Sequence, residues 1–423
     1  MRKFFISVFV CLSIFVIGLE FIYAISAGSE LVHNGFRKDR NMQALSGNML
    51  QTGFVANGGT VLAPGAVWKI GAFLPLTGPY AEIGLRFKQG LELALAAEKK
   101  TAYPWWIDYI DSAAISPAVA LADFKHRGVN IVLGPIQSSL ARPVVKVAIS
   151  LRLPLIILAP QPELARLDRT VFQHFLSAAD EAREVVRLLY RRSESRVVLL
   201  HPKNSFGDLF SQVFTQACQS HEITIWKNSS YSTEAVDFSL VIKGLRQSPP
   251  GANCDHEKVD DAIPCYPFSA LVVADFWPRL RLILPQLAFF GIEEPQLYAT
   301  SRGSELNSVK AAADSKLEGI IFIDSSFHSP QPVNLVKNYK NSYFKTYNEL
   351  TSIYDAYAYD TVRLLAEARK LMVRGEGGDL VDSLLKLPVL ELVTGTTSVT
   401  AAGVFAKRLC PVTYKSGKLM QVQ

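Results

Sequence analysis

The sequence predicts an α/β protein with two similar lobes, each a parallel sheet covered by helices, joined by a hinge that several chain segments cross. Three observations predict this fold. The chain has 423 residues, of which 49% are hydrophobic and 19% charged, which is enough for two compact cores. Short apolar runs alternate with amphipathic stretches from Trp68 onward, which is typical of a parallel sheet with helices on both faces. The alternation restarts after residue 176, which indicates a second lobe.

The first 27 residues are predicted to be an export signal or an uncleaved membrane anchor. Arg2 and Lys3 precede a mostly apolar run from Phe4 to Leu19, and small residues follow it. Cys11 lies inside the apolar run without small residues before it, so we do not expect it to carry a lipid. Residues 28–66 are rich in Gly, Asn and Ala and show no helical or strand period, so we expect a flexible leader.

The first lobe is predicted over residues 67–176. The run WKIGAFLPL, which starts at Trp68, predicts a buried strand, followed by a turn at Thr77-Gly78-Pro79 and an amphipathic helix from Tyr80 to Lys99. The same reasoning predicts further strands near Trp105–Ile110, Ile131–Leu133 and Leu155–Leu158, with helices over Ser116–Arg127 and Ser139–Arg152.

The second lobe is predicted over residues 177–299. The alternation predicts helices over Ala179–Arg192, Phe206–Gln219, Val236–Gln247 and Pro278–Phe290, with strands at 196–201, Thr224–Lys227, Ala270–Val273 and Gln296–Ala299. The two lobes open alike, because each has an apolar strand, a short polar loop, an aromatic residue, a nearby glycine and an amphipathic helix. We interpret this likeness as a weak internal repeat.

The last third of the chain is predicted to complete both lobes. It has a strand at 318–324, helices near Asn334–Asn348 and Tyr354–Arg374, and a β-like end from Ala402 to Tyr414. These pieces are too small for a third domain. We therefore assign about 300–352 to the first lobe and about 353–423 to the second, which makes the chain cross between lobes more than once.

Charge and cysteine content restrict the partners. The net charge of +6 comes from 44 basic and 38 acidic residues without basic blocks, so nucleic acid is not an expected partner. Beyond the signal the cysteines are Cys218, Cys254, Cys265 and Cys410, which allow three pairings in an oxidising compartment. We favour a local Cys254–Cys265 disulfide. The rival is a metal site of Cys254, His256 and Cys265, which lacks a convincing fourth ligand.

The sequence contains no motif that convincingly indicates an enzyme. The dinucleotide, Walker, HExxH and GxSxG patterns are missing. Ser342 and Lys345 match SxxK, but no KTG element accompanies them and they lie in a tyrosine-rich helical stretch. Asp108 and Asp111 are interpreted as a solvated residue and a turn cap rather than as a catalytic pair. The sequence therefore predicts a binding protein without catalytic residues, cofactor or metal, and with membrane contact only through its N-terminal segment.

The candidate ligand site consists of polar residues that follow strands. In open α/β lobes, ligands bind beyond the carboxyl ends of the strands. Ser138 and Ser139 also begin a helix, whose free N–H groups favour an anion or a carbonyl oxygen; the alternative is that they only cap the helix. The candidate ligand-binding residues are Thr77, Gln137, Ser138, Ser139 and Gln161 from the first lobe, and Phe206, Asp275, Ser301 and Arg302 from the second.

Several segments resemble a known family. IGAFLPLTGPYAEIG, VLGPIQSSLARPV and PLIILAP resemble the type 1 periplasmic binding proteins, whose Leu/Ile/Val-binding members feed ABC importers. The resemblance extends from Trp68 to the C-terminus and implies two Rossmann-like lobes in an exported, periplasmic protein. PLIILAPQPEL, FLSAADEAREVVRLL, LYATSRG and LEGIIF are more similar to the penicillin-binding protein activator branch, which shares the fold, carries no catalysis and stimulates peptidoglycan synthases by contact.

The resemblance implies a non-enzymatic regulator of cell-wall synthesis, with a peptidoglycan synthase as its partner. The alternative is the substrate-binding protein of an ABC importer, with an ABC permease as its partner and a small polar or anionic solute as its ligand. Ser138 matches the family serine that holds a substrate carboxylate. Ile83 replaces the expected aromatic residue, and Pro160-Gln161-Pro162 shortens the loop after the fourth strand.

Arg302 falls where amino-acid binders place the glutamate that receives the α-ammonium. Two desolvated cations in contact repel by roughly 4 kcal/mol at an effective dielectric constant of 20. Asp275 compensates only if it turns into the cleft, and Arg302 has a structural ion pair as its alternative role. We therefore expect an anionic or neutral hydroxylated ligand rather than a free α-amino acid.

Overall fold

The computed structural model describes residues 67–98, 105–245, 267–301, 317–416 and 418–422. Within them no helix is both long and apolar enough to cross a membrane. The predicted signal or anchor at 1–27 and leader at 28–66 lie outside the described residues, as do Cys254 and Cys265.

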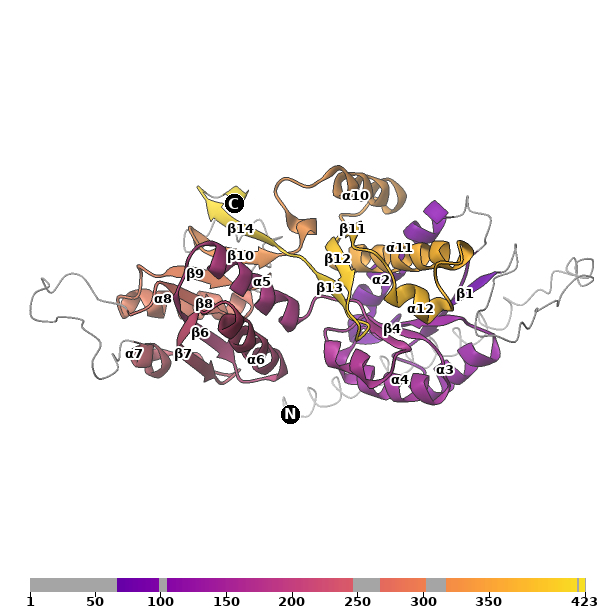
Figure 1. The fold of residues 1–423 in the computed structure, drawn as a ribbon, viewed down its shortest axis with the longest axis horizontal. Coiled ribbons are helices and arrows are strands. Elements are labelled where there is room, and N and C mark those ends of the chain that lie inside the picture. The colour runs from indigo at the N-terminus through magenta and orange to yellow at the C-terminus, as the bar shows by residue number, and fades with distance from the viewer. Residues whose placement is uncertain (1–66, 99–104, 246–266, 302–316, 417, 423) are drawn as a thin grey trace, which may run out of the picture. The chain divides into compact units, whose positions relative to one another are not determined.

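The first lobe is built on a sheet of five parallel strands (Figure 1). Their order across the sheet is β2 (Trp105–Asp111), β1 (Trp68–Leu74), β3 (Ile131–Leu133), β4 (Leu155–Ile157) and β5 (Val171–Gln173).

Helices cover both faces of this sheet because its central strands are apolar on both sides. Successive strand residues point to opposite faces. Ile70, Ala72 and Leu74 accordingly join one buried cluster, with side chains of α2 (Ala81–Glu98) and α11 (Ile353–Val373). Phe73 joins another, with side chains of α3 (Pro117–His126) and α4 (Ser138–Ser150).

The second lobe has a seven-stranded sheet. Its strand order is β15 (Lys418–Gln421), β14 (Cys410–Lys415), β10 (Ile321–Asp324), β9 (Gln296–Ala299), β8 (Ala270–Val273), β6 (Arg196–Pro202) and β7 (Thr224–Tyr231). The five strands from β10 to β7 in this order pair in parallel, and β14 and β15 extend the sheet as antiparallel strands.

The same alternation places helices on both faces of the second sheet. Val197 and Leu199 of β6 pack with α5 (Ala178–Arg191) and α6 (Ser205–Ser220). Val198 and Leu200 pack with α7 (Ser239–Leu245) and α8 (Trp277–Phe289). The predicted fold class, two α/β lobes with parallel sheets, is confirmed.

The last third of the chain is distributed differently from the sequence-based assignment. Strand β10, expected in the first lobe, is an inner strand of the second sheet. Helix α11, expected in the second lobe, packs along α2 of the first (Figure 1). Helices α10 (Asn334–Tyr347) and α12 (Leu380–Leu385) also pack against the first lobe, as does a three-stranded antiparallel sheet of β11 (Leu390–Leu392), β12 (Gly395–Val399) and β13 (Phe405–Lys407).

The described chain passes between the two lobes at three places. These lobe crossings are residues 174–177 between β5 and α5, 325–333 between β10 and α10, and 408–409 between β13 and β14. His174 lies in the first crossing and is fully buried.

Candidate functional site

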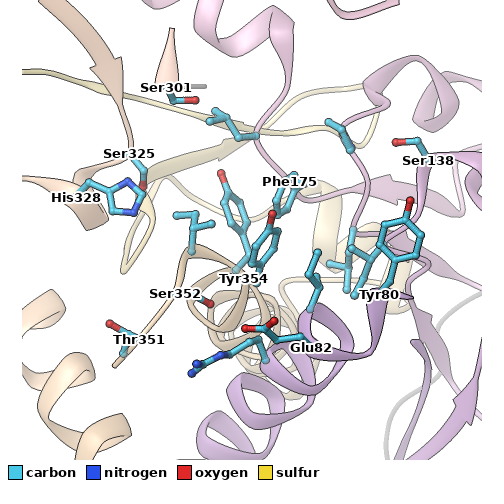
Figure 2. Close-up of a pocket in the computed structure, with 18 of the residues that line it drawn as sticks. Tyr80, Glu82, Ser138, Phe175, Ser301, Ser325, His328, Thr351, Ser352 and Tyr354 are labelled. Atoms are coloured by element: carbon cyan, nitrogen blue, oxygen red, sulfur yellow. The ribbon is translucent and has the colours of Figure 1, made fainter. Parts of the chain in front are cut away.

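A pocket of about 1160 Å³ is lined by residues of both lobes and of the crossings (Figure 2). Pockets of roughly 300–1,000 Å³ hold drug-sized molecules, so this one is large enough for a small organic ligand or a short chain segment. Figure 2 shows Tyr80 and Ser138 on one side of the pocket, and Ser301, Ser325 and His328 on the opposite side.

The N-terminus of α4 forms one wall of the pocket. Gln137, Ser138 and Ser139 line the pocket, and both serines are exposed. No side chain caps the helix and its first turn has no acidic residue, so the positive end of the helix dipole is not neutralised by its own side chains. Ser112 orients the Gln137 amide by donating to its Oε1 at 3.0 Å. This wall favours a negatively charged or carbonyl group.

Aromatic side chains from three segments form a second wall. Tyr80, Phe175, Tyr354 and Tyr357 line the pocket. The rings of Phe175 and Tyr354 are stacked with centroids 6.1 Å apart, and Phe175 lies 4.6 Å from the ring of Tyr357. Such a wall provides apolar contact area for a ligand.

Two buried carboxylates lie on the side opposite α4, and both bind donors of the chain itself. Glu181 accepts hydrogen bonds at Oε1 from the backbone N–H of Ser301 at 2.8 Å and from its hydroxyl. Asp324 accepts one at Oδ1 from the Ser325 N–H at 2.6 Å, and its Oδ1 lies 2.9 Å from Nδ1 of His328. The carboxylates thereby hold the loop after β9 and the second lobe crossing.

Ser325, His328 and Asp324 do not form a nucleophilic relay, although all three line the pocket. The Ser325 hydroxyl donates to the carbonyl oxygen of Thr394 at 2.8 Å, whereas a nucleophilic serine needs its hydroxyl directed at the base. Ser342 and Lys345 of the SxxK pattern are exposed residues of α10 and are not among the pocket-lining residues. This geometry is suited to binding.

The pocket contains part of the set of site residues proposed from sequence. Gln137, Ser138, Ser139 and Ser301 line it. Arg302 lies outside the described residues. The proposal that these residues bind a ligand stays a proposal.

The other proposed residues lie elsewhere for identifiable reasons. Thr77 donates to Asp111 at 2.5 Å, and Phe206 packs on the core between α5, α6 and the second sheet. Asp275 is buried and accepts from the Tyr231 hydroxyl at 2.8 Å. Gln161 has its Oε1 buried and is not a lining residue.

Sequence reasoning missed the pocket residues that come from the lobe crossings and the start of α11. Ser352, Tyr354 and Tyr357 belong to a segment that does not follow a parallel strand. His328 follows the parallel strand β10, so the rule that ligands bind beyond the ends of such strands could have found it. Tyr343, in the tyrosine-rich helical stretch, is a fully buried core residue and is not among the pocket-lining residues. Tyr80 has a signal in the sequence, because the internal repeat has an aromatic residue near the start of the first helix of each lobe.

Solved structures with similar folds include transport proteins and a regulator. A putative branched-chain amino acid ABC transporter from Rhodospirillum rubrum shares 19% identity at a TM-score of 0.71, covering 84% of this chain and 100% of that one. The substrate-binding protein LivJ from Streptococcus pneumoniae in complex with isoleucine shares 22% at 0.57, covering 84% and 99%.

The C-domain of LpoA from Haemophilus influenzae, a regulator of PBP1A, shares 16% identity at a TM-score of 0.61, covering 84% of this chain and 100% of that one. At these identities the likenesses show a common fold. No curated protein sequence matches the chain.

The sequence itself matches one family over most of its length. The family model described as "Periplasmic binding protein" aligns with residues 67–415. These residues include the first sheet, all strands of the second sheet except β15, and every pocket-lining segment except β15, which contributes Leu419. The chain belongs to the periplasmic binding protein family.

Proposed function

We propose that this chain is an exported, non-enzymatic regulator of peptidoglycan synthesis of the penicillin-binding protein activator type. Its partner is a peptidoglycan synthase, and it works in the periplasm, with membrane contact only through its N-terminal segment. The segments FLSAADEAREVVRLL and LYATSRG support the proposal by resemblance, and the likeness to the LpoA C-domain, whose whole length is covered, is consistent with it.

The observation that carries the proposal is the engagement of the two pocket carboxylates. An amino-acid binder needs acidic or carbonyl acceptors for the ligand's ammonium group. Here Glu181 holds Ser301, and Asp324 holds Ser325 and His328. These acids therefore serve the protein's own loops and crossings, which favours a structural rather than an amino-acid-binding role for this side of the pocket.

The test is a synthase assay with the purified full chain. A bifunctional peptidoglycan synthase from the same organism is supplied with lipid-linked precursor, and glycan polymerisation and cross-linking are measured with and without the chain. We expect faster synthesis and a chemically cross-linked complex. Unchanged rates together with the lack of any cross-linked complex contradict the proposal, and heat-denatured chain is the control.

A second candidate function is the substrate-binding subunit of an ABC importer. The observation that favours it is the pocket itself, in which Ser138 and Ser139 begin α4 opposite the second lobe and aromatic rings line a wall. The ligand class that this arrangement fits is a small anionic or neutral hydroxylated solute.

The two functions separate in a thermal-shift screen of carboxylates, sugars and amino acids. A ligand that binds only the native state, at 100 times its Kd, stabilises it by about 2.7 kcal/mol. A specific upward shift in Tm with one solute class, together with an inactive synthase assay, favours the importer subunit.

A further inference from the structure

Lys407, the last residue of β13, carries a charge into the interior of the protein where the chain crosses between lobes. Only 4% of its surface is exposed. Its Nζ donates to the Thr394 and Thr397 hydroxyls, each at 2.7 Å. Within the described ranges no carboxylate lies within ion-pair distance of this ammonium. A buried charge that is hydrogen-bonded but not directly ion-paired is costly to the folded state.

The groups around Lys407 link α11 to two of the crossings. Thr394 links α11 to the second crossing, because its hydroxyl donates to Asp360 of α11 at 2.6 Å and its carbonyl oxygen accepts from Ser325. Asp360 also accepts from the Val393 and Thr394 N–H groups at 3.0 and 2.7 Å. In the first crossing, Nδ1 of His174 lies 2.8 Å from the hydroxyl oxygen of Thr361, which belongs to α11.

The ammonium of Lys407 also lies against an aromatic ring that lines the pocket. Nζ of Lys407 lies 5.2 Å from the centroid of the Tyr357 ring, and Tyr357 lines the pocket. Any movement of Lys407 out of the interior therefore changes the support of a pocket wall.

We propose that the buried ammonium of Lys407 is a built-in opening device, which keeps the junction between the lobes poised to open so that the charge can reach water. It acts whichever ligand or partner the protein binds. Opening hydrates the ammonium, releases it from Thr394 and Thr397 and frees Tyr357. Removing the charge holds the junction closed.

The charged and titratable groups around Lys407 are consistent with an ammonium that gains stability by reaching water. They are Asp360 and Tyr357 from α11, Asp180 from α5, and His174 from the first crossing. Burial lowers the pKa of Lys407 to about 8, although Asp360 and Asp180 act to raise it. Burial lowers the pKa of His174 well below its usual value and raises that of Tyr357 well above it. His174 is thus neutral and Tyr357 protonated across the range where Lys407 titrates.

Lys407→Met is the decisive substitution. It keeps an unbranched side chain and removes the charge. It leaves both threonine hydroxyl hydrogens paired, because Thr394 donates to Asp360 and Thr397 donates to the Gly395 carbonyl at 2.8 Å. Lys88→Met is the matched control, since Lys88 lies 5.0 Å from the Tyr109 ring on the first lobe, away from the crossings.

The readout is hydrogen–deuterium exchange of the full chain. The reporters are the amides of Val393 and Thr394, bound to Asp360, and of Arg408, which donates to Thr396 O at 2.9 Å. We expect Lys407→Met to slow exchange at these amides at pH 7 at least severalfold, with strands β1 and β6 and the control variant unchanged. Faster or unchanged exchange at the reporters overturns the proposal and makes Lys407 a structural tie.

A second measurement needs no substitution. If opening exposes a lysine whose pKa returns to its ordinary value, protection factors at the reporter amides of the wild-type chain rise about tenfold between pH 7 and pH 9. The rise is missing in Lys407→Met. Protection that falls or stays constant in the wild-type chain over this range refutes the device, even if the variant fails to fold.

Discussion

Gly84 and Gly207 hold equivalent positions in the two lobes, each at the point where a helix approaches the backbone at the end of the preceding strand. A Cβ added to Gly84 would lie 1.8 Å from the carbonyl oxygen of Pro75, and one added to Gly207 would lie 2.0 Å from that of Pro202. Each glycine thus allows the first turns of its helix, α2 or α6, to pack against the chain segment that leads into it. The weak repeat seen in the sequence therefore has a packing cause.

We predict that Gly84→Ala and Gly207→Ala each destabilise the protein by at least about 2 kcal/mol, because backbone atoms cannot yield to the added methyl group. Thermal unfolding measures the effect as a lowered Tm. The matched control is Gly244→Ala in α7, where a Cβ meets nothing within 4 Å, so that the helix gains about 0.5–1 kcal/mol. Equal Tm values for all three variants would show that the close approaches are unimportant.

Asp111 supports the turn that leads into α2. Its carboxylate accepts from Leu76 N–H at 2.9 Å, Ala113 N–H at 3.0 Å and the Thr77 hydroxyl. Burial alone would raise the pKa of Asp111, but the hydrogen bonds from Thr77, Ala113 and Leu76 outweigh it and lower the pKa. A carboxyl with a lowered folded-state pKa contributes stability above its ordinary pKa, and that contribution is lost as the pH falls through the folded value.

Asp111→Asn is therefore predicted to cost about 1 kcal/mol near neutral pH. The difference in Tm between the variant and the wild-type chain should begin to shrink below about pH 4, where the carboxyl of the unfolded chain becomes protonated while that of the folded chain, whose pKa is lowered, is still charged. Unfolding scans from pH 3 to pH 7 measure it. A difference that is constant across this range would mean that the charge of Asp111 contributes nothing.

The cysteines are predicted to differ in reactivity. Cys218 and Cys410 are free and buried, and burial raises the pKa of Cys218 to about 12 and that of Cys410 above its usual value. We expect iodoacetamide to modify neither in the native protein, because thiolates are the reactive form. After unfolding without reductant, both should be modified, while Cys254 and Cys265 remain linked in one peptide pair.

Peptide mass spectrometry distinguishes the outcomes. Modification of Cys254 and Cys265 in the unreduced chain would disprove the proposed disulfide. A linked peptide that joins either of them to Cys218 or Cys410 would disprove the pairing.

The alternation of strands and helices was predictable, because apolar strands buried on both faces and amphipathic helices have distinct patterns. The predicted helix from Ser139 to Arg152 corresponds to α4 at Ser138–Ser150. The lobe to which a late segment belongs was not predictable in this way. Helix α11 has an apolar face that would suit either sheet, and only its fit against α2 determines its place.

The candidate site likewise contains residues that the local sequence pattern predicts and residues that only the tertiary structure places there. Ser138 and Ser139 could be predicted because they follow the buried strand β3 after a short loop, and the ends of parallel strands meet at one edge. Asp275 also follows a strand, but the hydroxyl of Tyr231, distant in sequence, holds its carboxylate in the interior. His328 lines the pocket from the second crossing and Tyr354 from the start of α11, and the positions of both segments depend on tertiary structure rather than on local pattern.

Ser138→Asp tests whether the α4 wall binds an anion. A carboxylate in the first turn of a helix favours the helix by about 0.3–1 kcal/mol, so stability should be kept or slightly raised. The same carboxylate takes the position that we propose for the ligand's negative group, and we expect the affinity for an anionic ligand from the thermal-shift screen to fall at least about tenfold, or about 1.4 kcal/mol. Titration calorimetry measures the affinity.

Ser150→Asp, at the other end of α4, is the control for this substitution. A carboxylate there opposes the helix dipole, so it should lower the Tm slightly and leave ligand affinity unchanged. The affinity for a neutral ligand should be similar in both variants. If Ser138→Asp binds the anion as tightly as the wild-type chain, the N-terminus of α4 does not hold the ligand's charge, and Ser138 and Ser139 serve only to begin the helix.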